Sequence, residues 1–234
     1  MNNLLHVEGI HTFIGQFHIL ENVSLAVPTG SITPLLGRNG AGKTTTLRSI
    51  IGLLSPRQGR IVFDGEEIQG RPAYDIAALG IGYVPEHRAV FRDLTVAENL
   101  KIAERRKGDL ACRGDLIFEL FPDLKRFYQL PGGQLSGGQQ QMLSIARALV
   151  PENRLLLIDE PSEGLAPVLV EHIIRALRRL SDHTTVLLVE QNFRMASELA
   201  DRYFILDDGQ SVHSGQMAEL AQNQTLIAKY LGAG

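Results

Sequence analysis

The segment Gly37 to Thr44 restricts what this chain can fold into more than any other part of the sequence. It reads G-R-N-G-A-G-K-T and matches the pattern G-x-x-x-x-G-K-[ST] of a phosphate-binding loop. The apolar run Ile32 to Leu36 predicts a strand before it, and Lys43 to Leu54 predicts a helix after it. This context favours an α/β fold that binds nucleotide phosphates. The residues expected to bind the nucleotide are Gly37, Arg38, Asn39, Gly40, Ala41, Gly42, Lys43, Thr44 and Thr45.

Each residue type in this loop suits one part of a nucleoside triphosphate. The glycines leave successive backbone N–H groups free to surround the β-phosphate. Lys43 supplies a positive charge near the β- and γ-phosphates, and the hydroxyl of Thr44 can ligate Mg²⁺. A chance match to the pattern is the alternative, and the strand–loop–helix context makes it a weak one.

Two acidic residues, Asp159 and Glu160, follow the apolar run Leu155 to Ile158, which reads as a buried strand. Asp159 fits the residue that holds Mg²⁺, directly or through water. Glu160 fits the general base that orients and polarises the water attacking the γ-phosphate. Two solvated acids at a strand end are the alternative interpretation, which the complete phosphate loop upstream weakens.

A second glycine-containing block precedes the acidic strand. Two adjacent glycines allow a backbone to approach a ligand where a side chain would collide. Ser136 is placed to cap the helix suggested by Gln139 to Leu149, whose free N–H groups suit an anion. Alone, the block would be read as an ordinary turn, but its position ahead of an acidic strand favours a functional role. Its residues are Leu135, Ser136, Gly137, Gly138 and Gln139.

Predicted strands and helices alternate along most of the chain, which is typical of a mainly parallel, helix-covered sheet. We expect one domain over residues 1–234, with an α/β core over about 1–89 and 141–234. The segment of about 90–140 lacks clear strands and is expected to be a helical subdomain inserted in that core. The further expected strands are Ile61–Phe63, Ile81–Val84, Thr184–Val189 and Tyr203–Leu206, and the expected helices include Ala97–Arg105, Leu116–Tyr128 and one around Arg194–Ala200.

Composition excludes several classes of protein. The net charge of −3 gives no electrostatic case for binding nucleic acid. The longest apolar runs are far shorter than the roughly 20 residues of a membrane helix, and the first residues do not resemble a secretory signal. The single cysteine, Cys112, predicts neither an internal disulfide nor a metal cluster. We therefore expect a soluble chain of the cytosolic type.

The phosphate loop, the Leu135-Ser136-Gly137-Gly138-Gln139 block and Asp159-Glu160-Pro161 together resemble the nucleotide-binding subunits of ABC transporters. The resemblance extends from Leu4 to Leu231. It implies a parallel-sheet core with an antiparallel N-terminal β region and the helical subdomain, with ATP and Mg²⁺ as cofactors. It also implies that two ATP molecules lie between two subunits, where Ser136 and its glycines contact the ATP of the partner.

The same resemblance implies partners and a location. They are a second ABC ATPase subunit, two integral-membrane permeases and, indirectly, a solute-binding protein, with this chain on the cytoplasmic face of the membrane. A groove near Glu86 to Leu94 would receive a helix of the permease. Because the sequence holds one phosphate loop, one chain cannot form the two-nucleotide sandwich and needs a second subunit. The resemblance implies that this subunit is a different ATPase, which gives a heterodimer, and a homodimer is the alternative.

Four residues depart from the commonest pattern of the family. Glu86 stands where glutamine is usual and can ligate Mg²⁺ together with Thr44 and Asp159. Gln191 stands where histidine is usual and is expected to act beside the catalytic Glu160 as a neutral hydrogen-bond donor. Ala166 replaces an acid that helps to bridge the subunits. The adenine-stacking aromatic is displaced, so that Phe13 either stacks on the base or packs in the core. The four residues are Glu86, Gln191, Ala166 and Phe13.

Three stretches resemble one branch of the family, the ATPases of branched-chain amino-acid importers and of related urea and short-amide importers. They begin at Tyr83, Pro161 and Val189. This resemblance is less specific than the first, because ATPase subunits do not touch the solute. It implies import of branched-chain amino acids as the first hypothesis and import of urea or amides as the second. A non-transport ABC ATPase is a hypothesis from a different class, and so is a nucleotide switch that barely hydrolyses ATP.

Overall fold

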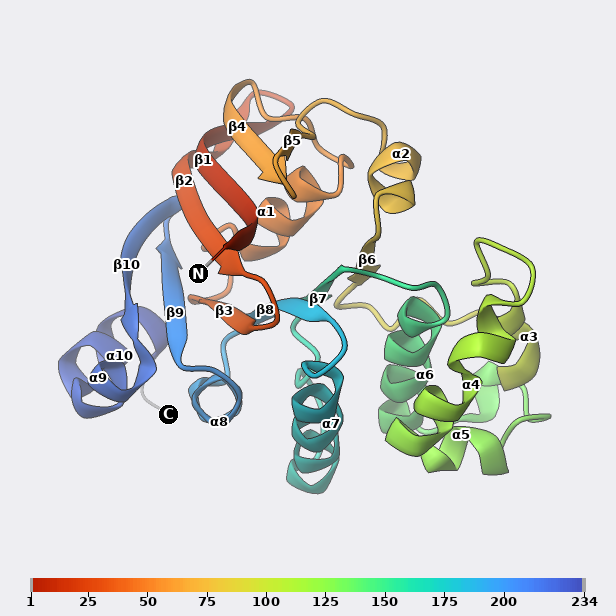
Figure 1. The fold of residues 1–234 in the computed structure, drawn as a ribbon. Helices are drawn as coiled ribbons and strands as arrows, with labels where there is room; N and C mark the ends of the chain where they lie inside the picture. Colours follow the sequence, from red (N-terminus) through yellow and green to blue (C-terminus); the bar gives the residue numbers. More distant parts are fainter. Residues whose placement is uncertain (1, 233–234) are drawn as a thin grey trace.

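The computed structural model describes residues 2–232, which form two β-sheets and the helices that cover them (Figure 1). The larger sheet has the strand order β10-β9-β3-β8-β7-β6, and its five strands from β9 to β6 run parallel, while β10 pairs antiparallel with β9. The expected mainly parallel sheet is confirmed. Its strands are β3 (Ile32–Leu36), β6 (Ile81–Val84), β7 (Leu155–Asp159), β8 (Thr185–Glu190), β9 (Arg202–Asp207) and β10 (Gln210–Gln216).

The register of the parallel strands brings their carboxyl ends to one edge of the sheet. Leu36, the last residue of β3, pairs with Glu190 of β8, and Asp159 of β7 pairs with Val189. The residues that follow these strands therefore meet at the same edge, which is where parallel α/β sheets bind their ligands.

The described residues form three buried hydrophobic clusters, and alternation along β7 separates the two larger ones. Leu155 and Leu157 of β7 pack in one buried cluster with β1, β2 and β4, whereas Leu156 and Ile158 pack in the other with the helices below the sheet. Successive side chains of a strand point to opposite faces, so an unbroken apolar run fits a strand that is covered on both sides. Helix α1 lies between the two sheets (Figure 1).

The smaller sheet is antiparallel, as the family resemblance implied, and has the order β2-β1-β4-β5. The alternation of β1 is interrupted around Gly9, where the register shifts and the backbone has a φ of 54°. Such a bulge hides the period-2 pattern from sequence reading. A turn at Asp64 and Gly65 connects β4 to β5. The strands are β1 (Asn3–Ile14), β2 (Phe17–Pro28), β4 (Gln58–Phe63) and β5 (Glu66–Glu67).

Helix α1 (Lys43–Ile50) is shorter than the helix expected over Lys43–Leu54. Gly52 follows it with a φ of 76°, in the left-handed region where an α-helix commonly ends. A Cβ at Gly52 would lie 2.5 Å from the carbonyl oxygen of Arg71, so this turn also requires glycine. The apolar residues after it belong to a loop.

The prediction of a single helix over Leu116–Tyr128 is wrong. The structure has α4 (Asp109–Leu120) and α5 (Pro122–Arg126), with Phe121 between them at a φ of −133°. Pro122 cannot donate a helical hydrogen bond, and a proline pushes the preceding residue out of the helical region. The apolar pattern continues across the break that Pro122 imposes, so the pattern alone predicted one helix.

The helices α3, α4 and α5 form a group with α6 at one side of the molecule, apart from the antiparallel sheet (Figure 1). The range of about 90–140 stays our proposal for the helical subdomain of the single domain. Among residues 2–232, none of the helices has the length and apolar character needed to cross a membrane. The remaining helices are α2 (Ala73–Ala78), α3 (Val96–Lys101), α6 (Gly137–Leu149), α7 (Pro167–Leu180), α8 (Phe193–Leu199), α9 (Met217–Gln222) and α10 (Gln224–Leu231), with a 3₁₀ turn η1 (Gly132–Gln134).

Candidate functional site

The phosphate loop connects the end of β3 to the start of α1 and is fitted closely between its neighbours. Gly37 and Gly42 have φ values of 154° and 101°. A Cβ would lie 2.4 Å from the carbonyl oxygen of Leu206 at Gly37, and 2.7 Å from the Leu20 side chain at Gly42. Only glycine fits both positions, so β9 and β2 determine where the loop runs.

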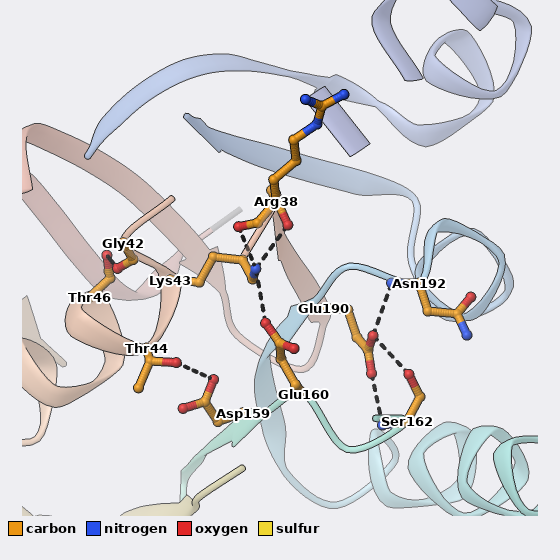
Figure 2. Close-up of polar contacts among 11 residues, drawn as sticks. Arg38, Gly42, Lys43, Thr44, Thr46, Asp159, Glu160, Ser162, Glu190 and Asn192 are labelled. Atoms are coloured by element: carbon orange, nitrogen blue, oxygen red, sulfur yellow. Dashed lines mark hydrogen bonds and ion pairs between the residues drawn. The ribbon is translucent and has the colours of Figure 1, made fainter. Parts of the chain in front are cut away.

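The Lys43 side chain lies inside the loop and is 3% exposed. Its Nζ donates to the carbonyl oxygens of Gly37 at 2.8 Å and Arg38 at 3.0 Å. It also forms an ion pair with Oε1 of Glu160 at 2.9 Å (Figure 2). The cation of the loop and the acid after β7 are therefore in direct contact.

Asp159 is held by two hydroxyl groups, one on each of its carboxylate oxygens. Thr44 Oγ1 donates to its Oδ1 at 3.1 Å, and the Tyr83 hydroxyl donates to its Oδ2 at 3.2 Å. Burial raises the pKa of Asp159 to about 6, and the negative charges of Glu160 and Glu86 contribute to the rise. Burial also raises the pKa of Tyr83 to about 12. This site concentrates negative charge on oxygen atoms, as a divalent cation requires.

Glu160 adopts a backbone conformation that is unusual for its type. Its φ is 43°, in the left-handed region, and its N–H donates to the carbonyl oxygen of Val189 at 3.0 Å. A non-glycine residue persists there only where the surrounding structure holds it, and such strain occurs at functional sites. The turn directs the carboxylate toward Lys43 (Figure 2).

Sequence reasoning missed the role of Glu190, the last residue of β8. It is 2% exposed and accepts hydrogen bonds from N–H and Oγ of Ser162, both at 3.0 Å, and from N–H of Asn192 at 3.1 Å (Figure 2). Burial raises its pKa to about 7, and the charge of Glu160 adds to this, while the three hydrogen bonds oppose it. The available signal was a carboxylate that ends an apolar strand, as Asp159 does.

This pKa predicts a pH effect on stability. The pKa of Glu190 is higher in the folded protein than its ordinary value of 4.5, so its contribution to stability is greatest below pH 4.5 and falls as pH rises through 7. In Glu190→Gln this decline is absent. The difference in free energy of unfolding, variant minus wild type, should therefore increase by about 2 to 3 kcal/mol between pH 5 and pH 8. Urea unfolding of both proteins at each pH measures this difference, and a constant difference would contradict the prediction.

Glu86 and Gln191 both lie after strands that end at this edge. Glu86 is half-buried, its charge acts on Asp159, and its Oε1 is 3.9 Å from Nδ1 of His87. Gln191 is exposed and directly follows β8. The structure therefore brings these two residues to the edge where the phosphate loop meets Asp159 and Glu160.

The block Leu135–Gln139 forms the start of α6. Ser136 is the N-cap, as expected: its Oγ accepts from the Gln139 N–H at 3.4 Å, and its own N–H donates to the Gln139 side chain at 2.9 Å. A Cβ at Gly137 would lie 2.6 Å from the Arg88 guanidinium, and one at Gly138 would lie 2.3 Å from Leu169. Across residues 2–232, no hydrogen bond or ion pair joins this block to the phosphate loop.

Phe13 is half-buried and belongs to none of the buried clusters, so of its two alternatives the structure does not show packing in the core. Its ring stacks on His18 with centroids 4.1 Å apart, and the Arg57 guanidinium carbon lies 4.2 Å from the ring centroid. Both groups therefore lie within stacking distance of the Phe13 ring. A base that stacks on Phe13 would compete with these groups for the ring.

Arg38 contributes its backbone to the phosphate loop, while its side chain points away from it. Its guanidinium Nη2 donates to the carbonyl oxygen of Ala228 in α10 at 3.2 Å, and Figure 2 shows it directed away from Glu160. The side chain of Arg38 thus connects the loop to the C-terminal helix.

Comparison with known proteins gives the family. The family model described as ABC transporter matches residues 20–163. A branched-chain amino-acid transport ATP-binding protein, BraG of Pseudomonas aeruginosa, is 41% identical over 98% of this chain and 100% of its own length. LivF of Archaeoglobus fulgidus, a probable protein of the same kind, is 39% identical over 89% of this chain and 90% of its own. The lipopolysaccharide export protein LptB of Haemophilus influenzae is 34% identical over 98% of both chains.

Solved structures of ATP-binding cassettes have the same fold. One cassette in its ADP conformation is 26% identical, with a TM-score of 0.86 over 98% of this chain and 97% of that chain. A dimeric cassette with bound ADP and phosphate is 26% identical, with a TM-score of 0.80 over 91% of this chain and 98% of that chain. The chain thus belongs to the ABC transporter family, as one of its ATP-hydrolysing subunits, and the resemblance to the branch of BraG and LivF is confirmed.

Proposed function

We propose that this chain hydrolyses ATP at the edge of the parallel sheet and that the hydrolysis drives solute import through a membrane partner. The observation that carries the proposal is the meeting of Lys43, Asp159 and Glu160 at the carboxyl ends of β3 and β7. The strands bring together a cation for phosphates, oxygen ligands for a metal and an acid able to accept a proton.

The residues present fit Mg²⁺. Thr44 and Asp159 place a hydroxyl and a carboxylate oxygen 3.1 Å apart, and the nearby Glu86 carboxylate adds to the negative charge. These are the hard oxygen ligands that Mg²⁺ prefers. We assign Thr44, Asp159 and Glu86 to the metal, directly or through water. The bound ion would neutralise charge on the β- and γ-phosphates.

We assign the proton transfer to Glu160. Its carboxylate accepts a proton from the water that attacks the γ-phosphorus, the bond from this phosphorus to the β–γ bridging oxygen breaks, and ADP and phosphate are the products. Lys43 balances the charge that develops on the phosphate oxygens. The Gln191 amide donates a hydrogen bond to a γ-phosphate oxygen, and it stays neutral throughout because an amide does not titrate. The ion pair of Lys43 with Glu160 in this structure keeps both groups in the site.

The Ser136 block supports a site shared between two subunits. Its glycines carry no side chain that would hinder the approach of a phosphate, and Ser136 stands at the N-terminus of α6, where N–H groups favour an anion. The related cassette with bound ADP and phosphate is a dimer. We infer that two ATPase subunits enclose two ATP molecules here as well, and that Leu135–Gln139 contacts the ATP of the partner.

The solute we propose is a branched-chain amino acid. BraG and LivF, both named for branched-chain amino-acid transport, support this, and urea and short amides are the second choice. LptB, at 34% identity, is named for lipopolysaccharide export and gives a different solute class to test. A short cytoplasmic helix of a permease would bind in a groove lined by residues near Glu86 to Leu94 and hold the chain at the cytoplasmic face of the membrane. A second permease, a second ATPase and a solute-binding protein would complete the assembly.

Reconstitution tests the proposal. The chain is co-purified with candidate permeases, reconstituted in vesicles, and assayed for ATP-dependent uptake of labelled leucine, urea and a short amide. Uptake of leucine alone supports the proposed solute, and uptake of urea or the amide shifts it to the related importers. If the chain hydrolyses ATP but forms a complex with none of the candidate permeases, the import proposal is wrong.

A further inference from the structure

We propose that Glu190 is a positioning residue for ATP hydrolysis, which fixes the loop that follows Glu160 and the turn that contains Gln191 in one arrangement. The inference rests on the roles proposed for Glu160 and Gln191. Glu190 acts through those two residues, because its carboxylate is committed to Ser162 and Asn192.

The carboxylate of Glu190 collects donors from both segments. Oε1 accepts from the Ser162 N–H, and Oε2 accepts from the Ser162 hydroxyl and from the Asn192 N–H. Ser162 lies two residues after Glu160, and Asn192 directly follows Gln191. One buried side chain therefore links the segments that carry the two proposed catalytic residues (Figure 2).

The end of β8 holds the turn after β7, which contains Glu160, at two points. The Glu160 N–H donates to the carbonyl oxygen of Val189, and the chain is held again at Ser162 by the Glu190 carboxylate. Glu160 has a φ of 43° and keeps it only under such restraint. Loss of the second restraint allows the turn to relax and the carboxylate of Glu160 to move.

Glu190 also fixes the turn that leads from β8 into the N-terminus of α8. Asn192 caps that helix by accepting from the Met195 N–H at 3.1 Å, while its own N–H donates to Glu190. Gln191 is confined between the end of β8 and this cap. Its exposed side chain therefore projects from a backbone that is fixed on both sides.

Glu190 is a buried carboxylate, and its burial indicates that the charge has a role other than stabilising the fold. Within residues 2–232 it forms no ion pair, and the charged group that acts on it is Glu160, which repels it. A buried charge without a cation reduces stability, so folding alone does not require it. Three converging donors need an acceptor on both oxygens, which a carboxylate supplies and an amide does not.

A double-mutant cycle on hydrolysis tests the proposal. Wild type, Glu190→Gln, Ser162→Ala and the double variant are compared for kcat and for ATP dissociation constant at pH 8. Glu190→Gln should lower kcat by roughly 10- to 100-fold, because a small misplacement of catalytic groups has effects of that size. Ser162→Ala should lower it by roughly three- to tenfold. The double variant should be no slower than Glu190→Gln, and ATP affinity should change less than about twofold, because binding and positioning are separate.

Control variants distinguish the positioning role of Glu190 from the proposed role of Glu160 as the base. Glu152→Gln removes an exposed carboxylate before β7, at the end of the strand opposite to Asp159, and should leave kcat unchanged. If Glu190→Gln does not fold, Ser162→Ala still tests the link, because it keeps the buried carboxylate. A wild-type kcat in Glu190→Gln, or independent effects of the two changes, overturns the positioning role. Normal hydrolysis by Glu160→Gln would overturn the proposed base instead.

Discussion

Glu160→Gln should reduce ATP hydrolysis by roughly 10²- to 10⁴-fold, the range that a positioned general base contributes. The amide keeps the shape of the side chain and can still accept a hydrogen bond from Lys43, but it cannot take a proton from water. ATP binding should persist, because the loop and Lys43 are unchanged, and the removed negative charge lowers repulsion of the phosphates.

The measurements are single-turnover hydrolysis and size-exclusion chromatography with ATP. A variant that binds ATP without cleaving it should accumulate as a closed dimer, whereas wild type should not. Glu152→Gln is the matched control, since it makes the same chemical change on the exposed surface. If Glu160→Gln hydrolyses ATP at the wild-type rate, another group is the base.

Lys43→Ala should raise the dissociation constant for ATP by roughly 10- to 150-fold, because hydrogen bonds to charged groups contribute about 1.5 to 3 kcal/mol. The Lys43 side chain is 3% exposed, and its amine already donates to two carbonyl oxygens of the loop, so it meets the phosphates with little further ordering. The variant also removes the cation that faces Glu160.

Fluorescent nucleotide titration measures this effect for Lys43→Ala and for Lys125→Ala, which removes an exposed lysine of α5. Thermal unfolding of both variants shows whether the fold is kept. An unchanged affinity in folded Lys43→Ala would contradict the role assigned to this residue.

The sequence predicted the parts of the site that are continuous in the chain. The phosphate loop is a string of eight residues whose types are each required locally, and Asp159 with Glu160 follows an unmistakable buried strand. Ser136 was identified as a cap from its position before a helical run, and the structure shows that cap. Each of these depends on neighbours within a few residues, which a sequence displays directly.

Further features of the fold were hidden from sequence reading. The break between α4 and α5 was missed because the apolar pattern continues across Pro122, and β1 was hidden by its bulge at Gly9. The contacts of Phe13 with His18 and Arg57 join two strands of a hairpin to the loop before β4. Sequence periodicity contains no information about such pairs.

The amino-acid sequence by itself determined the family, the phosphate loop and the acids that follow β7, because those features are strings of local residue types. Only the tertiary structure decided that Lys43 pairs with Glu160, that Tyr83 and Thr44 both hold Asp159, and that Glu190 joins Ser162 to Asn192. The reason is register. Which residues meet at the edge of a parallel sheet depends on how the strands align, and hydrogen bonds between distant strands determine that alignment.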